Sequence, residues 1–237
     1  MAANTTTVAL VGCTGLVGSH ILTTLTSLTT PPPIHALARK SLPSTSPTLT
    51  PHIEPASSSW PSILKSLTPS AKVFISALGT TKAQAGSFEA QRKIDYDLNL
   101  SLAKAARESG AETYVLISSA AVSTSSFFPY SKMKAELEEA VKELGFPHTV
   151  IMKPGLLVGE RKDSRPPEAV FRYVAKGMKK LGGAALTDWW AQDADVIAKA
   201  AVSAGLACAE GKREKGVWVV EQSEIIRLGR KEWEGEK

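Results

Sequence analysis

The chain has 237 residues, a hydrophobic fraction of 43% and a formal net charge of +5 at pH 7. This length suits one α/β domain with an ample core, and the two cysteines give neither a disulfide framework nor metal-ligand spacing, which favours a reducing compartment. The sequence contains no apolar run near the ~18 residues of a membrane span, and no aromatic-interleaved basic stripe supports nucleic-acid binding.

The apolar run Val8–Val11 predicts a buried strand close to the amino end. Gly12, Gly15 and Gly18 follow at G-x-x-G-x-x-G spacing, and a helix is predicted over Leu16–Leu28. In such a unit the first glycine permits a tight turn, the second lets a pyrophosphate approach the backbone, and the third allows close helix–strand packing. The pattern therefore predicts a dinucleotide-binding loop; the alternative is an ordinary glycine-rich turn between a strand and a helix.

Strands and helices alternate along the rest of the chain, which predicts an α/β fold of the Rossmann type with a doubly wound parallel sheet. Further strands are predicted over Ile34–Ala38, His52–Glu54, Val73–Leu78, Tyr114–Ile117, Thr149–Met152 and Val217–Val220. Further helices are predicted over Pro61–Leu67, Asp95–Ser109 and Tyr130–Leu144, and after Asp193 and Asp195.

Two polar stretches, Ser41–Pro51 and Thr80–Lys93, are predicted to be loops. We expect a single NAD(P)-binding domain over residues 1–237, with a small substrate-covering insertion at 155–186 near its carboxyl end. The four histidines are expected to have structural roles.

The second predicted strand, Ile34–Ala38, bears on the choice of cofactor because its end meets the adenine ribose in dinucleotide folds. Arg39 and Lys40 follow it, with no acidic residue, and Arg39 lies 21 residues after Gly18. A guanidinium suits the 2′-phosphate of NADP, whereas a carboxylate would bind the 2′-hydroxyl of NAD. We therefore expect NADP(H); the alternative is an ordinary exposed Arg-Lys pair.

A Y-x-x-x-K pattern, Tyr130 to Lys134, begins the helix predicted over Tyr130–Leu144. Residues four apart share a helix face, and an ammonium near a phenol lowers the phenol's pKa, which suits acid–base chemistry on a carbonyl. Ser118 and Ser119 close the preceding strand at the edge where ligands bind in parallel sheets. Ser119 is the expected catalytic serine and Ser118 is the alternative; capping of the strand end would also explain a serine there.

These motifs together resemble the short-chain dehydrogenase/reductases, in particular the atypical branch that holds the Tat-interactive oxidoreductase and its fungal mitochondria-associated relatives. The resemblance covers nearly the whole chain. It is carried by Gly12–Gly18, Leu37–Lys40, Leu78–Thr81, Asp95–Tyr96, Leu116–Ser119, Tyr130–Lys134, Lys153–Gly155, Gly159–Arg161 and Ser164–Pro166.

The resemblance implies a role for each matching residue. The catalytic set would be Ser119, Tyr130 and Lys134, with Tyr130 giving the proton and Lys134 also holding the nicotinamide ribose. The cofactor-binding set would begin with Gly12, Thr14, Gly15, Leu16, Val17 and Gly18 at the pyrophosphate, and with Arg39 and Lys40 at the 2′-phosphate. It would continue with Leu78, Gly79 and Thr80 at the adenine side, with Ser118, Tyr130 and Lys134, and with Pro154, Gly155 and Leu156 at the nicotinamide.

Two positions depart from the family pattern. Asp95 stands where many members have an asparagine that helps a proton relay, and Lys153 stands where arginine is common before Pro154-Gly155. The first departure puts the relay in doubt but leaves cofactor binding as expected.

The main hypothesis is an NADPH-dependent oxidoreductase, of carbonyl reductase or alcohol dehydrogenase type, acting on a small-molecule carbonyl. Two alternatives are an NADP(H)-binding regulatory or scaffold protein with a protein or membrane partner, and a redox-neutral epimerase- or dehydratase-like enzyme. We expect a monomer or homodimer that is cytoplasmic or lies peripherally on the mitochondrial outer membrane. No cleaved presequence is expected, because the first strand begins so near the amino end.

Overall fold

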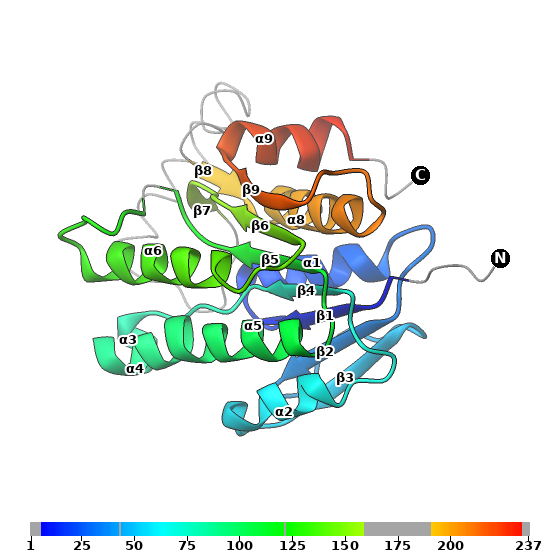
Figure 1. Ribbon diagram of the computed structural model, residues 1–237, viewed down its shortest axis with the longest axis horizontal. Helices are drawn as coiled ribbons and strands as arrows, with labels where there is room; N and C mark the ends of the chain where they lie inside the picture. Colours follow the sequence, from blue (N-terminus) through cyan, green and yellow to red (C-terminus); the bar gives the residue numbers. More distant parts are fainter. Residues whose placement is uncertain (1–5, 43, 121, 159–190, 234–237) are drawn as a thin grey trace.

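The computed structural model describes residues 6–42, 44–120, 122–158 and 191–233. Seven strands form one parallel sheet in the order β3-β2-β1-β4-β5-β6-β9 (Figure 1). These strands are β1 (Val8–Val11), β2 (Ile34–Ala38), β3 (Leu49–Ile53), β4 (Val73–Ser76), β5 (Thr113–Ile117), β6 (His148–Met152) and β9 (Gly216–Val220). A separate parallel pair joins β7 (Leu156–Val158) to β8 (Ala191–Asp193).

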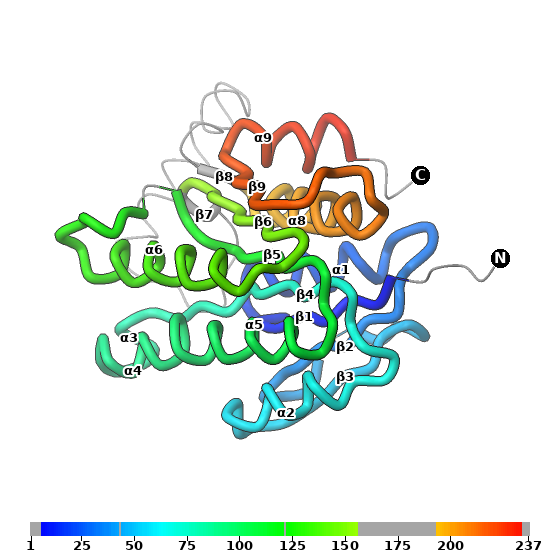
Figure 2. Tube along the Cα trace, in the orientation of Figure 1, coloured from blue at the N-terminus to red at the C-terminus, as the bar shows by residue number. Residues whose placement is uncertain are grey.

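Helices cover both faces of the sheet, as Figures 1 and 2 show. One face packs against α1 (Leu16–Thr26), α8 (Ala194–Ala209) and α9 (Gln222–Ile226), followed by the π-helical η4 (Arg227–Lys231). The other face packs against α2 (Trp60–Lys65), α5 (Asn99–Glu108) and α6 (Pro129–Lys142), with the short 3-10 helix η1 (Ser57–Ser59) before α2. The result is the three-layer α/β/α arrangement expected of a doubly wound sheet.

The alternation of side chains along β1 shows how the two layers are joined to the sheet. Val8 and Leu10 point into the core beside α1 and α8, whereas Ala9 and Val11 point into the core beside α5. All four are fully buried, because a parallel strand covered on both faces has no solvent side. This explains why the strand is a continuous apolar run rather than an alternating one.

The expected α/β Rossmann-type sheet is therefore confirmed, and three local predictions are corrected. β3 begins at Leu49, inside the stretch predicted to be a loop. The region Thr80–Lys93, also predicted to be a loop, contains α3 (Lys82–Ala85) and α4 (Phe88–Arg92). The predicted helix over Asp95–Ser109 begins earlier, as the π-helical segment η2 (Lys93–Leu98), which runs directly into α5.

The two short helices begin at side-chain caps. The hydroxyl of Thr81 accepts a hydrogen bond from the backbone N–H of Gln84, and that of Ser87 accepts one from Ala90. Such caps satisfy the N–H groups that a helix leaves unpaired at its start.

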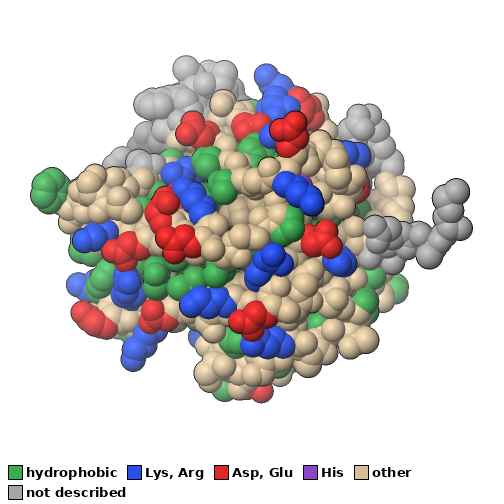
Figure 3. Space-filling view, in the orientation of Figure 1, with side chains coloured by type: hydrophobic (Ala, Val, Ile, Leu, Met, Phe, Trp, Pro, Cys, Tyr) green, Lys and Arg blue, Asp and Glu red, His purple; other side chains and the backbone are tan. Residues whose placement is uncertain are grey.

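Basic and acidic side chains are interspersed on the face of the molecule drawn in Figure 3. Within the described part of the chain, no helix is long and apolar enough to cross a bilayer. A substrate-covering insertion is predicted at 155–186. Its residues 159–186 lie outside the part of the chain that the structure describes.

Candidate active site

The candidate site lies where the strand order changes direction, between β1 and β4. Ligands of open parallel sheets bind outside the carboxyl ends of the strands at this point. Gly12 follows β1 with a φ of 80°, and a Cβ there would overlap the carbonyl group of Ala77, just after β4. The glycine turn after β1 and the segment after β4 therefore lie against each other, and only glycine fits between them.

The other two glycines shape the start of α1. The N–H of Gly15 donates to the carbonyl of Gly12 at 2.9 Å and closes the turn. A Cβ at Gly18 would overlap the same Gly12 carbonyl, so the first turn of α1 packs directly on the loop. Gly15 is the N-cap, and the first turn carries no acidic side chain. The helix start thus offers backbone N–H groups and a positive dipole end, a fit for an anionic pyrophosphate.

The side chains predicted at this loop differ in burial. Thr14 is exposed and Leu16 half-buried, whereas Val17 is buried in the core against the sheet. Val17 could therefore contact a dinucleotide through its backbone alone. Arg39 and Lys40 are exposed directly after β2, the strand beside β1. They lie at the position where the adenine ribose is held in this fold class.

The segment after β4 is held by a buried carboxylate. Asp95 accepts a hydrogen bond from the N–H of Thr80 at 2.7 Å, and the amide of Gln91 donates to the Thr80 carbonyl at 3.1 Å. Burial raises the pKa of Asp95, while the nearby charge of Lys134 and the Thr80 hydrogen bond oppose that rise. A Cβ at Gly79 would meet no atom within 4 Å, so this backbone has open space in front of it.

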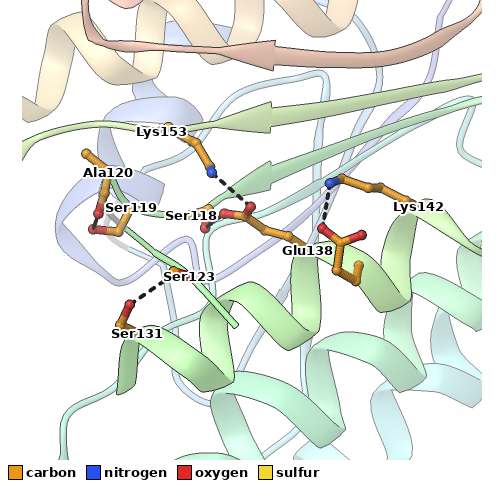
Figure 4. Close-up of polar contacts among 9 residues, drawn as sticks. Ser118, Ser119, Ala120, Ser123, Ser131, Glu138, Lys142 and Lys153 are labelled. Atoms are coloured by element: carbon orange, nitrogen blue, oxygen red, sulfur yellow. Dashed lines mark hydrogen bonds and ion pairs between the residues drawn. The ribbon is translucent and has the colours of Figure 1, made fainter. Parts of the chain in front are cut away.

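The two candidate serines differ in the partners of their hydroxyls (Figure 4). The Ser118 hydroxyl donates to Oε1 of Glu138 on α6 at 2.5 Å and is buried. The Ser119 hydroxyl makes a longer, 3.3 Å contact with the carbonyl oxygen of Ala120 and is half-buried. A hydroxyl engaged by a buried carboxylate is not available to a substrate, so the geometry favours Ser119 over Ser118 as the substrate-facing serine.

Tyr130 and Lys134 lie in the first turns of α6. Tyr130 is 44% exposed, whereas Lys134 is 3% exposed and its Nζ donates to the carbonyl of Ile117 at the end of β5. Burial lowers the pKa of Lys134, and the carboxylates of Asp95 and Glu138 oppose that effect. Helix α6 thus buries Lys134 against the end of β5 and leaves Tyr130 partly exposed to solvent.

Two backbone contacts bring the loops of this edge together. The N–H of Ala120 donates to the carbonyl of Pro154 at 2.7 Å, which joins the segments after β5 and β6. The N–H of Ser123 donates to the hydroxyl of Ser131 at 3.2 Å, which ties the loop after Ser119 to the residue following Tyr130 (Figure 4). Gly155 follows Pro154 directly, and Leu156 begins β7.

Sequence reasoning missed two buried polar residues at this site. Asn99 is fully buried; its carbonyl oxygen accepts from the hydroxyl of Ser76, and its amide donates to the carbonyls of Ile94 and Asp95. Those carbonyls lie in the π-helical segment η2, which the Asn99 side chain therefore joins to the end of β4. Glu138 is buried as well, and its position four residues after Lys134 on a helix face was the available signal.

The sheet order and the glycine turn define a Rossmann-type α/β protein. The chain belongs to the fmp52 family. It is 49% identical over 230 residues to "Protein fmp52, mitochondrial" of Emericella nidulans, covering 94% of this chain and 98% of the relative. The Neurospora crassa protein of that family is 43% identical, with 96% and 97% covered. The HIM1 family model also matches residues 64–178.

Solved structures share the fold at low sequence identity. The UDP-Glc/GlcNAc 4-epimerase of Campylobacter jejuni has a TM-score of 0.68 at 14% identity, covering 94% of this chain and 82% of that one. A short chain dehydrogenase family protein of Francisella tularensis has a TM-score of 0.63 at 11% identity, with 92% and 98% covered. The expected resemblance to short-chain dehydrogenase/reductases is thus confirmed for the fold.

Proposed function

We propose that this protein is an NADP(H)-dependent oxidoreductase that reduces a small-molecule carbonyl or oxidises the corresponding alcohol. One observation carries the proposal: the glycine turn follows β1, Ser119 follows β5, and Lys134 donates to the carbonyl of Ile117 at the end of β5, so all three lie toward the carboxyl edge of one parallel sheet. Tyr130 precedes Lys134 by four residues on α6. The exposed Arg39 and Lys40 after β2 support NADP over NAD, since no carboxylate directly follows that strand.

A bound nicotinamide supplies or accepts the hydride in this chemistry. The residues of the chain bind the reactants and move the proton. The Ser119 hydroxyl donates a hydrogen bond to the carbonyl oxygen, and the Tyr130 hydroxyl gives that oxygen its proton as hydride arrives at carbon. The Lys134 ammonium stabilises the phenolate left on Tyr130. Pro154, Gly155 and Leu156 would bound the nicotinamide of the cofactor.

The test is consumption of NADPH with a panel of aldehydes and ketones, comparing wild type with Tyr130→Phe. We expect the substitution to lower kcat by about 100-fold or more, because it removes the general acid. The matched control is Tyr114→Phe, which removes a hydroxyl buried in the core near the amino end of β5. Equal turnover by wild type and Tyr130→Phe would refute the proposed role of the phenol.

A redox-neutral reaction is the second candidate, and the structural neighbours are its basis. Several of them are named as 4-epimerases, and MoeE5 was solved with UDP-glucose and NAD. In such a reaction the cofactor would be oxidised and reduced within one turnover. Product formation without net loss of NADPH would favour this candidate over carbonyl reduction.

We also propose that the protein acts in mitochondria, peripherally on the outer membrane. The names of the relatives, which call them mitochondrial, support the mitochondrial part of this proposal. Fractionation of cells followed by extraction of the membranes at alkaline pH tests it, and a peripheral protein is released by that treatment.

A further inference from the structure

Four ionisable side chains of alternating charge lie behind the candidate active site. Asp95 on η2, Lys134 and Glu138 on α6 are 1%, 3% and 4% exposed, and the side chain of Lys153, just after β6, is 23% exposed. Neighbouring members interact: the charges of Asp95 and Glu138 both act on Lys134, and Lys153 forms an ion pair with Glu138. Buried charges persist only when opposite charges and hydrogen bonds compensate them, so these four groups depend on one another.

Glu138 contacts both Ser118 and Lys153, as Figure 4 shows. Its Oε1 accepts the hydrogen bond from Ser118 at 2.5 Å, and its Oε2 lies 3.1 Å from Nζ of Lys153. Glu138 is also four residues beyond Lys134, so the two side chains share a face of α6. Glu138 and Asp95 are the two carboxylates whose charges support the Lys134 ammonium.

This arrangement matters because burial disfavours the charged form of Lys134. A neutral amine at this position could not stabilise a phenolate on Tyr130. We propose that Glu138 is a positioning residue that keeps Lys134 protonated and holds the Ser118 hydroxyl on the α6 side, leaving Ser119 to meet the substrate. Its consequence for catalysis rests on the proposed oxidoreductase function, whereas its effect on Lys134 does not.

The ion pair between Glu138 and Lys153 allows a test in which two substitutions should shift the pKa of Lys134 in opposite directions. Glu138→Gln removes a negative charge and should lower the pKa of Lys134. Lys153→Met removes the competing cation, frees the Glu138 charge to act on Lys134, and should raise the same pKa. A merely structural role of Glu138 would not produce shifts of opposite sign.

The experiment is an NMR titration of protein labelled with carbon-13 at the lysine ε position, without cofactor or substrate. The Lys134 signal is identified by its loss in Lys134→Arg. We expect its midpoint to fall by about 1 pH unit in Glu138→Gln and to rise in Lys153→Met. The matched control is Glu139→Gln, since Glu139 is exposed and pairs with Lys142 rather than with a member of the buried set.

An unchanged Lys134 midpoint in Glu138→Gln would overturn the inference. Should Glu138→Gln not fold, Lys153→Met decides: a raised midpoint supports the inference, and an unchanged one overturns it. In an active enzyme, Glu138→Gln should also shift the pH profile of kcat, and Glu139→Gln should not. Absence of turnover in wild type, together with the expected Lys134 shifts, would count against the proposed function while supporting this inference.

Discussion

The backbone of Gly12 lies against that of Ala77, with no space for a side chain between them. This contact joins the turn after β1 to the end of β4, the two strands on either side of the switch point. The N–H of Ala77 also donates to the carbonyl of Val11 at 3.1 Å, so the two segments are fixed by a hydrogen bond as well as by packing. Small changes in this turn should therefore affect both stability and nucleotide binding.

Gly18→Ala tests that coupling. The new methyl group would overlap the Gly12 carbonyl, so we expect a loss of about 1–3 kcal/mol in the free energy of unfolding. Binding of NADPH should weaken too, because α1 must move away from the loop. Urea unfolding and calorimetry measure the two effects. Gly79→Ala is the control for stability, since its Cβ would meet no atom within 4 Å.

Arg39→Ala tests the cofactor preference. Loss of charged hydrogen bonds to the 2′-phosphate should weaken NADPH binding by about 10- to 100-fold and leave NADH binding unchanged. Calorimetric titration of wild type and variant with both cofactors measures this difference. Arg107→Ala is a suitable control, because Arg107 lies in the last turn of α5, away from the strand end that carries Arg39. Equal weakening of NADPH and NADH would contradict the assigned role.

Alanine substitutions at Ser118 and Ser119 should have opposite effects: one should lower mainly stability, the other mainly kcat/KM. Ser118→Ala removes a donor from the buried carboxylate of Glu138 and should lower stability by about 1–3 kcal/mol, with a small effect on kcat/KM. Ser119→Ala should leave stability nearly unchanged and lower kcat/KM by about 100-fold, because a donor to the carbonyl oxygen is lost. Parallel unfolding and kinetic measurements separate the two, and a reversed pattern would assign catalysis to Ser118.

The paired histidines at the edge of the sheet predict loss of stability in acid. Nδ1 of His35 on β2 lies 3.0 Å from Nε2 of His52 on β3, and burial lowers the pKa of both rings. Because the folded-state values lie below the unfolded value of 6.5, the stabilisation is complete above that pH and is lost as pH falls through the folded values. Unfolding midpoints should drop between about pH 7 and about pH 5.

His52→Gln checks this origin. It removes one titrating ring and keeps a polar side chain, so the acid-induced drop should become smaller. His20→Gln is the control, because His20 is exposed on α1 and does not belong to the His35–His52 pair. An identical drop in wild type and His52→Gln would place the acid sensitivity elsewhere in the protein.

The sequence predicts the sheet well because β1, β2, β4, β5 and β6 are apolar runs of the length of a buried strand. β3 begins at Leu49, before the predicted strand His52–Glu54, because its exposed edge position leaves Leu49 and Thr50 in a polar context. The helices in Thr80–Lys93 were missed because they are only four and five residues long, and hydroxyl caps rather than an apolar stripe define them.

At the site, the sequence places the glycine loop and the Ser-Tyr-Lys positions because their spacing is local. It did not predict the partners of those residues. Glu138 would ordinarily be assigned to the solvent face of a charged helix, and its contact with Lys153 joins segments that only the fold brings together. The pairing of His35 with His52 likewise depends on the register between β2 and β3.

The π-helical turn over η2 has a consequence for the geometry of the whole helix. Its backbone hydrogen bonds span five residues instead of the four of an α-helix. Asp95 and Asn99, which are four residues apart, both face inward, one toward Thr80 and the other toward Ser76. One helix is thereby fixed both to the last residue of β4 and to the loop that follows it, so a displacement of this helix would move both together.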